Sequence, residues 1–163
     1  MIKIAVLTVS TSGFEGTRED SAGPKIIEFL GESEYSQTDY IIVEDNVDKI
    51  SDQLKISADS GDIDVIVTTG GTGIASSDVT PDACDKVMDR EIPGISEAIR
   101  SHSLSFTPMA MLSRSVVGIR KKTLIITLPG NPKAVNQCLE VVKPVLPHVV
   151  ELLQKDTVYN HPN

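Results

Sequence analysis

The sequence predicts an α/β domain of three layers, α/β/α, with a mostly parallel, doubly wound sheet in the middle. Two observations indicate this fold. Almost wholly apolar stretches occur at Ile2–Val9, 63–68 and Thr123–Leu128, and such stretches are typical of strands buried on both faces of a parallel sheet. Segments with the apolar spacing of helices lie between them, and this alternation favours parallel strands joined by crossover helices.

The first half of the chain follows this alternation closely. Its expected elements are a strand at 2–9, a helix at 21–30, a strand at 40–43, a helix at 47–58 and a strand at 63–68. Gly31 is a typical end signal for the first helix. In the second helix Ile50, Leu54 and Ala58 lie on one apolar stripe, which is expected to face the sheet.

The second half is expected to contain a helix from Pro81 to about 89, a helix at 95–102, a strand at 123–128 and helices at 133–142 and 145–153. Thr80 is expected to cap the first of these helices, and Pro93-Gly94 to break it. The segment 109–117 is ambiguous, and Gly118 is expected to mark a turn.

Length and composition narrow the function classes. The 163 residues carry a net charge of −8, which argues against nucleic acid as the main partner. The sequence has no apolar run near the roughly 18 residues of a membrane span, and its first residues do not resemble a signal peptide. We therefore expect a cytoplasmic protein, with one domain at 1–155 and a loose tail at 156–163.

The charge is unevenly distributed. Residues 114–143 hold six Lys and Arg residues against one acidic residue, Glu140, within an otherwise acidic chain. Such a basic segment suits a small anionic ligand. An ordinary solvated surface explains it equally well.

A glycine-dense loop follows the third expected strand. Its residues Gly70, Gly71, Thr72 and Gly73 let backbone N–H groups approach an anion closely, although a tight turn is the simpler alternative. The loop is not a P-loop, because no Gly-Lys-Ser/Thr sequence follows. We expect it to contact a ligand, because ligands of open α/β sheets bind beyond the carboxyl ends of the strands.

Two carboxylates follow expected strands. Asp45 either caps the helix that begins near Val47 or faces a ligand, and Asp78 is either a solvated loop residue or a ligand residue. We expect their strands to be adjacent and parallel, so that both carboxylates point into one crevice. Because Mg²⁺ is commonly held by one or two carboxylates together with substrate phosphates, the pair predicts a metal–nucleotide site.

Two further segments suit anions. The turn formed by Pro129, Gly130, Asn131, Pro132 and Lys133 opens a helix, whose N-terminus attracts phosphate. Ser113-Arg114 offers an arginine fork. A surface lysine and a surface ion pair are the alternatives for the two cations. The histidines and cysteines show no metal-ligand spacing, and a protein nucleophile is not expected.

Five motifs occur in order along the chain: TTGGTG at 68–73, DVTPDA at 78–83, LSR at 112–114, GIRKKTLIITLPG at 118–130 and NPKA at 131–134. Together they resemble the molybdopterin adenylyltransferases of molybdenum-cofactor biosynthesis, a family that includes the gephyrin G domain. The resemblance extends from about residue 2 to about residue 153.

The resemblance implies a trimer that transfers AMP from ATP to the terminal phosphate of molybdopterin with Mg²⁺, giving adenylyl-molybdopterin and pyrophosphate. It also implies that Asp45 and Asp78 are the functional carboxylates and metal ligands, and that 70–73, Ser113-Arg114 and 129–133 bind substrate. A protein that inserts molybdenum is a further partner that the resemblance suggests.

Two positions depart from the family pattern. Thr11 stands where many relatives carry an acidic residue, and Ser77 where many carry arginine. A non-catalytic module that binds or carries molybdopterin is the main alternative function. An interaction domain of the gephyrin kind and a pyrophosphohydrolase-like enzyme are weaker alternatives.

Overall fold

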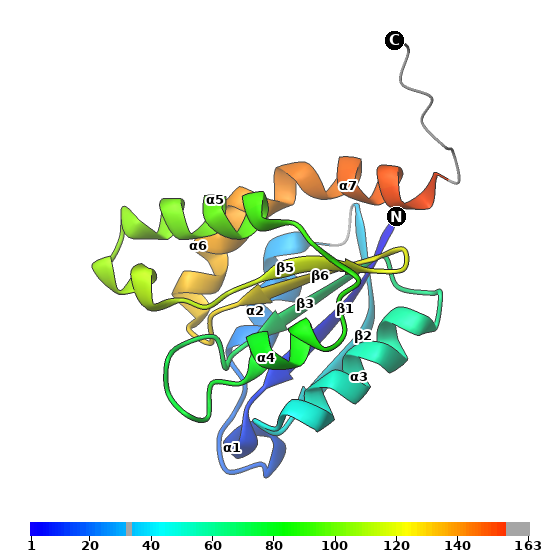
Figure 1. Ribbon diagram of the computed structural model, residues 1–163. Coiled ribbons are helices and arrows are strands. Elements are labelled where there is room, and N and C mark those ends of the chain that lie inside the picture. The colour runs from blue at the N-terminus through cyan, green and yellow to red at the C-terminus, as the bar shows by residue number, and fades with distance from the viewer. Residues whose placement is uncertain (32–33, 156–163) are drawn as a thin grey trace.

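The computed structural model describes residues 1–31 and 34–155. They form one six-stranded sheet between two layers of helices (Figure 1). The expected α/β/α fold is therefore confirmed. The expected tail at 156–163 lies outside the described residues. Within the described part, no helix is long and apolar enough to cross a membrane.

The sheet is mostly parallel. Its strands lie in the spatial order β2 (Tyr35–Val43), β1 (Ile2–Val9), β3 (Val65–Thr69), β6 (Thr123–Leu128), β5 (Val117–Arg120) and β4 (Arg90–Glu91). The first four are parallel to one another, whereas β5 is antiparallel to β6 and β4 is antiparallel to β5. Short antiparallel strands thus end one side of a parallel sheet.

Helices cover both faces of this sheet. One face packs against α2 (Ala22–Leu30), α5 (Pro93–Leu104), α6 (Pro132–Val142) and α7 (Leu146–Gln154), and the other against α3 (Val47–Asp59) and α4 (Thr80–Asp85). The short helices are α1 (Thr11–Phe14), η1 (Pro108–Leu112) and η2 (Lys143–Val145). In β3 the side chains of Val65 and Val67 belong to the first core and that of Ile66 to the second, as the two-residue period of a strand requires.

The parallel strands end level with one another. Thr69 is the partner of both Thr8 and Leu128, and Val9 is the partner of Val43. The loops that follow these four strands therefore leave the sheet along a single edge. This carboxyl edge is where a parallel α/β sheet binds ligands.

Several expected boundaries are wrong for reasons of packing. The helix at Thr80 ends at Asp85 rather than near 89. Pro93-Gly94 does not break a helix but lies in the first turn of α5, where proline is well tolerated. Gly118 lies inside β5 rather than in a turn. Glycine is needed there because a Cβ atom would stand 2.6 Å from the carbonyl oxygen of Arg90 on the neighbouring strand.

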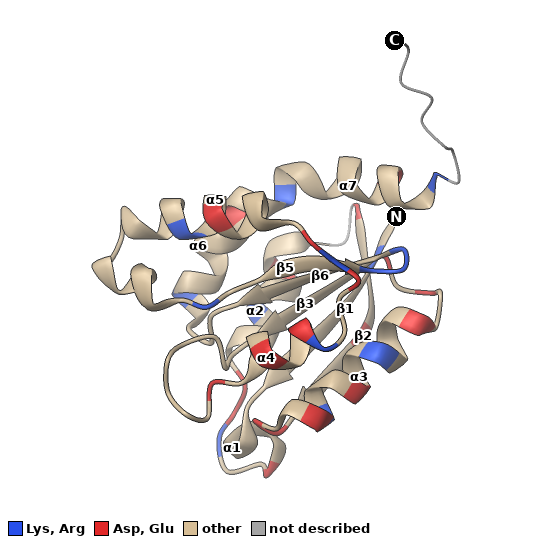
Figure 2. Ribbon diagram, viewed as in Figure 1, with Lys and Arg blue, Asp and Glu red and all other residues tan. Residues whose placement is uncertain are grey.

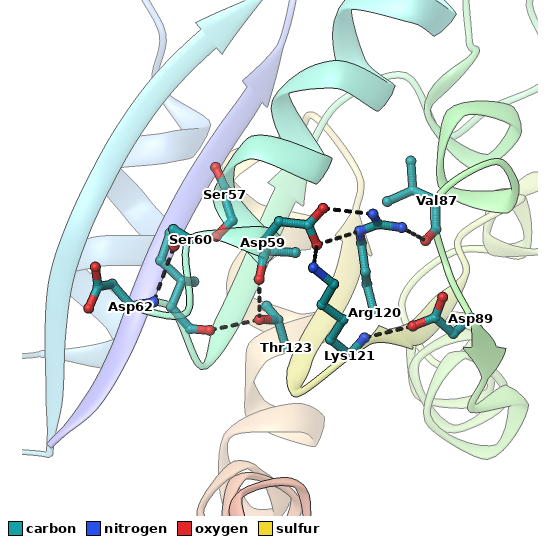
Figure 3. A network of polar contacts seen from close by, with 11 residues as sticks. Ser57, Asp59, Ser60, Asp62, Val87, Asp89, Arg120, Lys121 and Thr123 are labelled. Carbon is teal, nitrogen blue, oxygen red and sulfur yellow. Dashed lines mark hydrogen bonds and ion pairs between the residues drawn. The ribbon is translucent and has the colours of Figure 1, made fainter.

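The basic segment does not form one surface. Arg120 and Lys121 lie at the β5–β6 turn, away from the carboxyl edge (Figure 2). There both side chains contact the Asp59 carboxylate, and the backbone N–H of Lys121 donates to Asp89 (Figure 3). These charges stabilise the far end of the sheet instead of meeting a ligand.

Candidate active site

Two cavities open at the carboxyl edge and share Gly130. The larger has a volume of about 430 Å³ and the smaller about 160 Å³. Of the residues expected to bind substrate or metal, the larger is lined by Gly71, Thr72, Gly73, Asp78, Ser113, Pro129, Gly130 and Asn131, and the smaller by Gly70 and Gly130. The structure thus brings together three segments that are far apart in the sequence, 70–78, Ser113 and 129–131.

Gly70 and Gly71 separate the two cavities. Their φ angles are +98° and +63°, in the region that glycine adopts at no steric cost. A Cβ atom on Gly71 would stand 2.5 Å from the Thr80 hydroxyl, and one on Gly130 would stand 3.4 Å from the Gly70 Cα. The turn at Gly71 therefore has no room for a side chain, and the Gly130 loop packs against Gly70.

Thr80 holds this glycine turn. Its hydroxyl donates to the Gly70 carbonyl at 2.8 Å, and its N–H donates to the Gly71 carbonyl at 3.0 Å. Thr80 is not the expected helix cap, since α4 begins at Thr80 itself and Val79 precedes it as a cap without a side-chain bond. The completely buried hydroxyl is used for the turn instead.

Asp78 lies in the wall of the larger cavity. Its Oδ2 atom accepts the Ala75 N–H at 2.9 Å, and its own N–H donates to the Ala75 carbonyl at the same distance. Among the described residues, no donor is paired with its Oδ1 atom. The carboxylate is thus oriented by one oxygen and leaves the other for a ligand.

Asp45 is held by α1. Its Oδ2 atom accepts the backbone N–H of Thr11 at 2.8 Å and the Thr11 hydroxyl at 2.9 Å. Asp45 is not the cap of α3, because the Asn46 side chain caps it by accepting from Asp48 and Lys49. Asp45 itself lines neither cavity, but Ser10 beside Thr11 lines the smaller one.

The assumption that Asp45 and Asp78 follow adjacent strands is wrong, because β1 lies between β2 and β3. Adjacent strands are about 4.8 Å apart, so the two strands are about 10 Å apart. Asp78 belongs to the larger cavity and Asp45 to the α1 side of the glycine turn. The carboxylates therefore approach the site from two directions.

Ser113 and Arg114 have different surroundings. Ser113 lines the larger cavity, whereas the guanidinium of Arg114 lines neither and bonds to the Gly73 and Asp78 carbonyls and to the Asp82 carboxylate. Arg100 of α5 also lines the larger cavity and donates to the Ser113 carbonyl at 3.0 Å. Nothing in the sequence singles out Arg100, because its place depends on how α5 packs.

Asn131 caps the helix that follows the 129–133 turn, a role not predicted from the sequence. The Asn131 side chain accepts from the N–H groups of Lys133 and Ala134 at 2.9 and 3.3 Å. Pro132 is at the start of the helix. The Lys133 side chain is exposed and, like Pro132, is not part of either cavity wall. Asn131 thus uses two of the helix N-terminal donors that a phosphate would otherwise contact.

Asp20 lines the smaller cavity but lies outside the five motifs of the sequence. Its carboxylate accepts from the Thr8 and Tyr40 hydroxyls, both at 2.6 Å, and from the N–H groups of Ala22 and Gly23 at 2.9 and 3.2 Å. Partial burial opposes ionisation, but these four donors lower the pKa of Asp20 below its usual value. Burial and the Asp20 carboxylate raise the pKa of Tyr40 to about 12.

The donor chemistry fits Mg²⁺ bound through a substrate. Among residues 1–31 and 34–155, no group of three or more His, Cys, Asp or Glu side chains is placed to hold a metal by itself. Asp45 and Asp78 each have one oxygen engaged within the protein. Because Mg²⁺ usually takes one or two protein carboxylates and completes its shell with phosphates and water, the Asp78 carboxylate in the cavity wall fits such an ion, whereas Asp45 lines neither cavity.

Comparison with known proteins gives consistent results. The family described as "Probable molybdopterin binding domain" matches residues 5–148. The molybdopterin adenylyltransferase of Helicobacter pylori (strain ATCC 700392 / 26695) is 44% identical over 154 residues, covering 93% of this chain and 88% of that protein. The Escherichia coli (strain K12) protein of the same name is 38% identical over 158 residues, covering 91% of this chain and 77% of that protein.

A solved structure agrees in fold as well. The molybdopterin biosynthesis enzyme MoaB of Thermus thermophilus superposes with a TM-score of 0.88 at 44% identity, covering 94% of this chain and 96% of that one. The family match spans both cavities and the turns between them. The chain therefore belongs to the molybdopterin-binding domain family of molybdenum-cofactor biosynthesis.

Proposed function

We propose that this protein is a molybdopterin adenylyltransferase, which transfers AMP from ATP to the terminal phosphate of molybdopterin and releases pyrophosphate. The observation that carries the proposal is the pair of cavities that share Gly130 and meet at the Gly70-Gly71 turn. Two anionic substrates that lie end to end across this turn would bring their phosphates together. The curated relatives that carry this activity in their names support the same reaction.

The reaction needs no protein nucleophile. An oxygen of the molybdopterin phosphate attacks the α-phosphorus of ATP, and the bond from that phosphorus to the pyrophosphate oxygen breaks. The protein must hold both substrates in line and stabilise the charge that develops. Backbone N–H groups of 71–73, Gly130 and Asn131 belong to residues that line the larger cavity beside that junction and are the neutral donors proposed for this role.

The carboxylates have a different role. Asp45 and Asp78 would hold Mg²⁺ through their remaining oxygens, and the ion would neutralise phosphate charge when it is bound. Asp78 does so from the larger cavity and Asp45 from the α1 side. The strand order supports two directions of approach rather than one shared crevice.

The larger cavity suits a ring system. Its lining combines apolar residues, Ile99, Met109, Leu112 and Ala134, with the glycine loop, Asp78 and Ser113. A planar heterocycle would pack against the apolar side chains while its phosphates contact the polar groups. This division is typical of ligand sites in which apolar surface supplies affinity and a few polar groups fix the orientation.

We also propose a cytoplasmic homotrimer that passes its product to a molybdenum-inserting protein. Exposed apolar side chains near η1 support an assembly, since Phe106, Met109 and Met111 are 51%, 62% and 67% exposed. Contiguous apolar surface on a folded protein commonly marks a contact site. Analytical ultracentrifugation at several concentrations tests the trimer, and a monomer throughout would contradict it.

A pyrophosphate-release assay tests the proposed reaction. Protein, ATP and Mg²⁺ should release pyrophosphate only when molybdopterin is added, and chelation of the metal should stop the release. Bound molybdopterin without pyrophosphate release would instead support the carrier function. Equal release with and without molybdopterin would indicate a hydrolase and contradict the transferase.

A further inference from the structure

We infer that Arg114 is a positioning residue that holds the loop 73–78 closed and thereby fixes Asp78, rather than a residue that contacts the substrate phosphates. The inference rests on the proposed function, because Asp78 is assigned to the metal there. The geometry of the loop carries it independently of any ligand. Arg114 directly follows Ser113, yet Ser113 lines the larger cavity, whereas the Arg114 side chain binds the Gly73 carbonyl.

The guanidinium joins the two ends of the loop. Its Nε donates to the Gly73 carbonyl at 3.2 Å, and its Nη2 donates to the Asp78 carbonyl at 3.2 Å. The backbone N–H of Arg114 adds a bond to the Thr72 carbonyl at 2.8 Å. A rigid, planar fork that binds both carbonyls sets the distance between them.

Asp82 completes the arrangement from α4. Nη1 of Arg114 lies 3.4 Å from its Oδ1 atom, and Nη2 contacts its Oδ2 atom. The two side chains are 40% and 51% exposed, so the ion pair by itself contributes little to stability. Its effect is instead to hold the guanidinium where it reaches both carbonyls.

The loop has little other support. Residues Ile74, Ala75, Ser76 and Ser77 are all exposed. Between the two carbonyls, the described part of the chain offers only the reciprocal Ala75–Asp78 bonds. The Asp78 carboxylate is oriented by one of these bonds, so its direction depends on the loop that Arg114 closes.

The hydrogen bonds of Arg114 within the protein leave few of its N–H donors for a ligand. Four of the five N–H donors of an arginine side chain are used on Gly73, Asp78 and Asp82. A phosphate would have to displace these partners before it could be bound as a fork. A positioning role for Arg114 therefore predicts that a change of Asp82 lowers the activity. A phosphate-binding role predicts that the same change leaves the activity unchanged or raises it.

The test compares Arg114→Gln, Asp82→Asn and the double variant. The inference predicts that Arg114→Gln lowers kcat about tenfold, the size expected for losing hydrogen bonds at a charged group. Asp82→Asn should lower kcat in the same direction by less, and the double variant should be no worse than Arg114→Gln. Arg114→Lys should not rescue kcat, because an ammonium cannot bind both carbonyls in one plane.

Amide hydrogen exchange of the ligand-free protein supplies a second readout. Exchange across 73–79 should be about tenfold faster in Arg114→Gln than in the wild type. Arg120→Gln is the matched control, because Arg120 also joins a carboxylate, Asp59, to a carbonyl, that of Val87, but at the far end of the sheet. It should leave exchange across 73–79 and kcat unchanged.

Three results would overturn the inference. One is unchanged exchange across 73–79 in Arg114→Gln. Another is full or increased activity of Asp82→Asn together with a higher KM for ATP or molybdopterin in Arg114→Gln, which would indicate a ligand contact. The third is rescue by Arg114→Lys. If the wild-type protein shows no transferase activity, the proposed function fails, but the exchange measurement still decides the role of Arg114.

Discussion

Thr11 and Asp45 bind each other reciprocally. The Thr11 hydroxyl donates to Asp45 Oδ2 at 2.9 Å and accepts the Asp45 backbone N–H at 3.0 Å, while the Thr11 N–H donates to the same oxygen at 2.8 Å. Thr11 is therefore a hydrogen-bond donor to the proposed metal ligand.

The side chain of Thr11 can be tested without changing its shape. In Thr11→Val the hydroxyl is lost, and kcat/KM should fall about 10- to 150-fold, because a hydrogen bond to a charged group contributes about 1.5–3 kcal/mol. Thr11→Ser retains the hydroxyl and should keep nearly all of the activity. Steady-state rates of AMP transfer measure both, and equal activity of Thr11→Val and the wild type would contradict the role.

Asp78 should be essential for turnover but not for folding. Asp78→Ala removes an oxygen ligand and leaves only the Ala75 N–H without its partner, so AMP transfer should be abolished while the thermal unfolding midpoint changes little. The matched control is Asp62→Ala, since Asp62 is an exposed carboxylate paired with Lys3 at the other end of the sheet. Wild-type turnover by Asp78→Ala would remove Asp78 from the mechanism.

The glycine turn can be tested with a pair of alanine substitutions. Gly71→Ala should destabilise the protein by at least about 1–2 kcal/mol, because its φ is +63° and the new Cβ would stand 2.5 Å from the Thr80 hydroxyl. Gly94→Ala should instead stabilise it by about 0.4–1 kcal/mol, because no atom lies within 4 Å of the added Cβ. Chemical denaturation measures both, and equal effects would contradict the turn geometry.

The far end of the sheet should show its own pH dependence. The side chains of Arg120 and Lys121 lower the pKa of Asp59 from 3.8 to about 2. A lowered pKa contributes stability that is present above the unfolded value and is lost as the pH falls through the folded value. Asp59→Asn should therefore be less stable than the wild type at pH 7, and this difference should disappear between pH 3.8 and about 2.

Urea denaturation across this pH range measures the difference. A constant gap between Asp59→Asn and the wild type would show that the charge of Asp59 does not contribute. AMP transfer at neutral pH should be unaffected, since Asp59 lies at the far end of the sheet from both cavities.

The interior of the sheet could be predicted well. The strands Ile2–Val9 and Thr123–Leu128 are found with the expected bounds, because central strands buried on both faces are apolar throughout. Strand β2 begins earlier than expected. Its exposed residues Gln37, Thr38 and Asp39 carry no apolar signal, since β2 is at the edge of the sheet.

Contacts between distant segments could not be predicted. The hydroxyl of Thr80 binds the Gly70 carbonyl rather than its own helix, and a local capping pattern contains no information on that choice. Strand order also cannot be deduced from alternation alone, so the sequence does not place β1 between the strands that precede Asp45 and Asp78. The glycine loop and the 129–131 turn can nevertheless be identified, because each directly follows a strongly apolar strand. Ser113 lies in a segment whose structure the sequence leaves ambiguous, so its place in the cavity wall depends on tertiary packing.

The most direct test of the proposed reaction is mass spectrometry of molybdopterin after incubation with the purified protein, ATP and Mg²⁺. The expected result is a product heavier than molybdopterin by one adenylyl group, which forms with the wild type, is absent without Mg²⁺ and is absent with Asp78→Ala. Molybdopterin that stays bound but unmodified, with ATP intact, would contradict the transferase and identify the protein as a carrier.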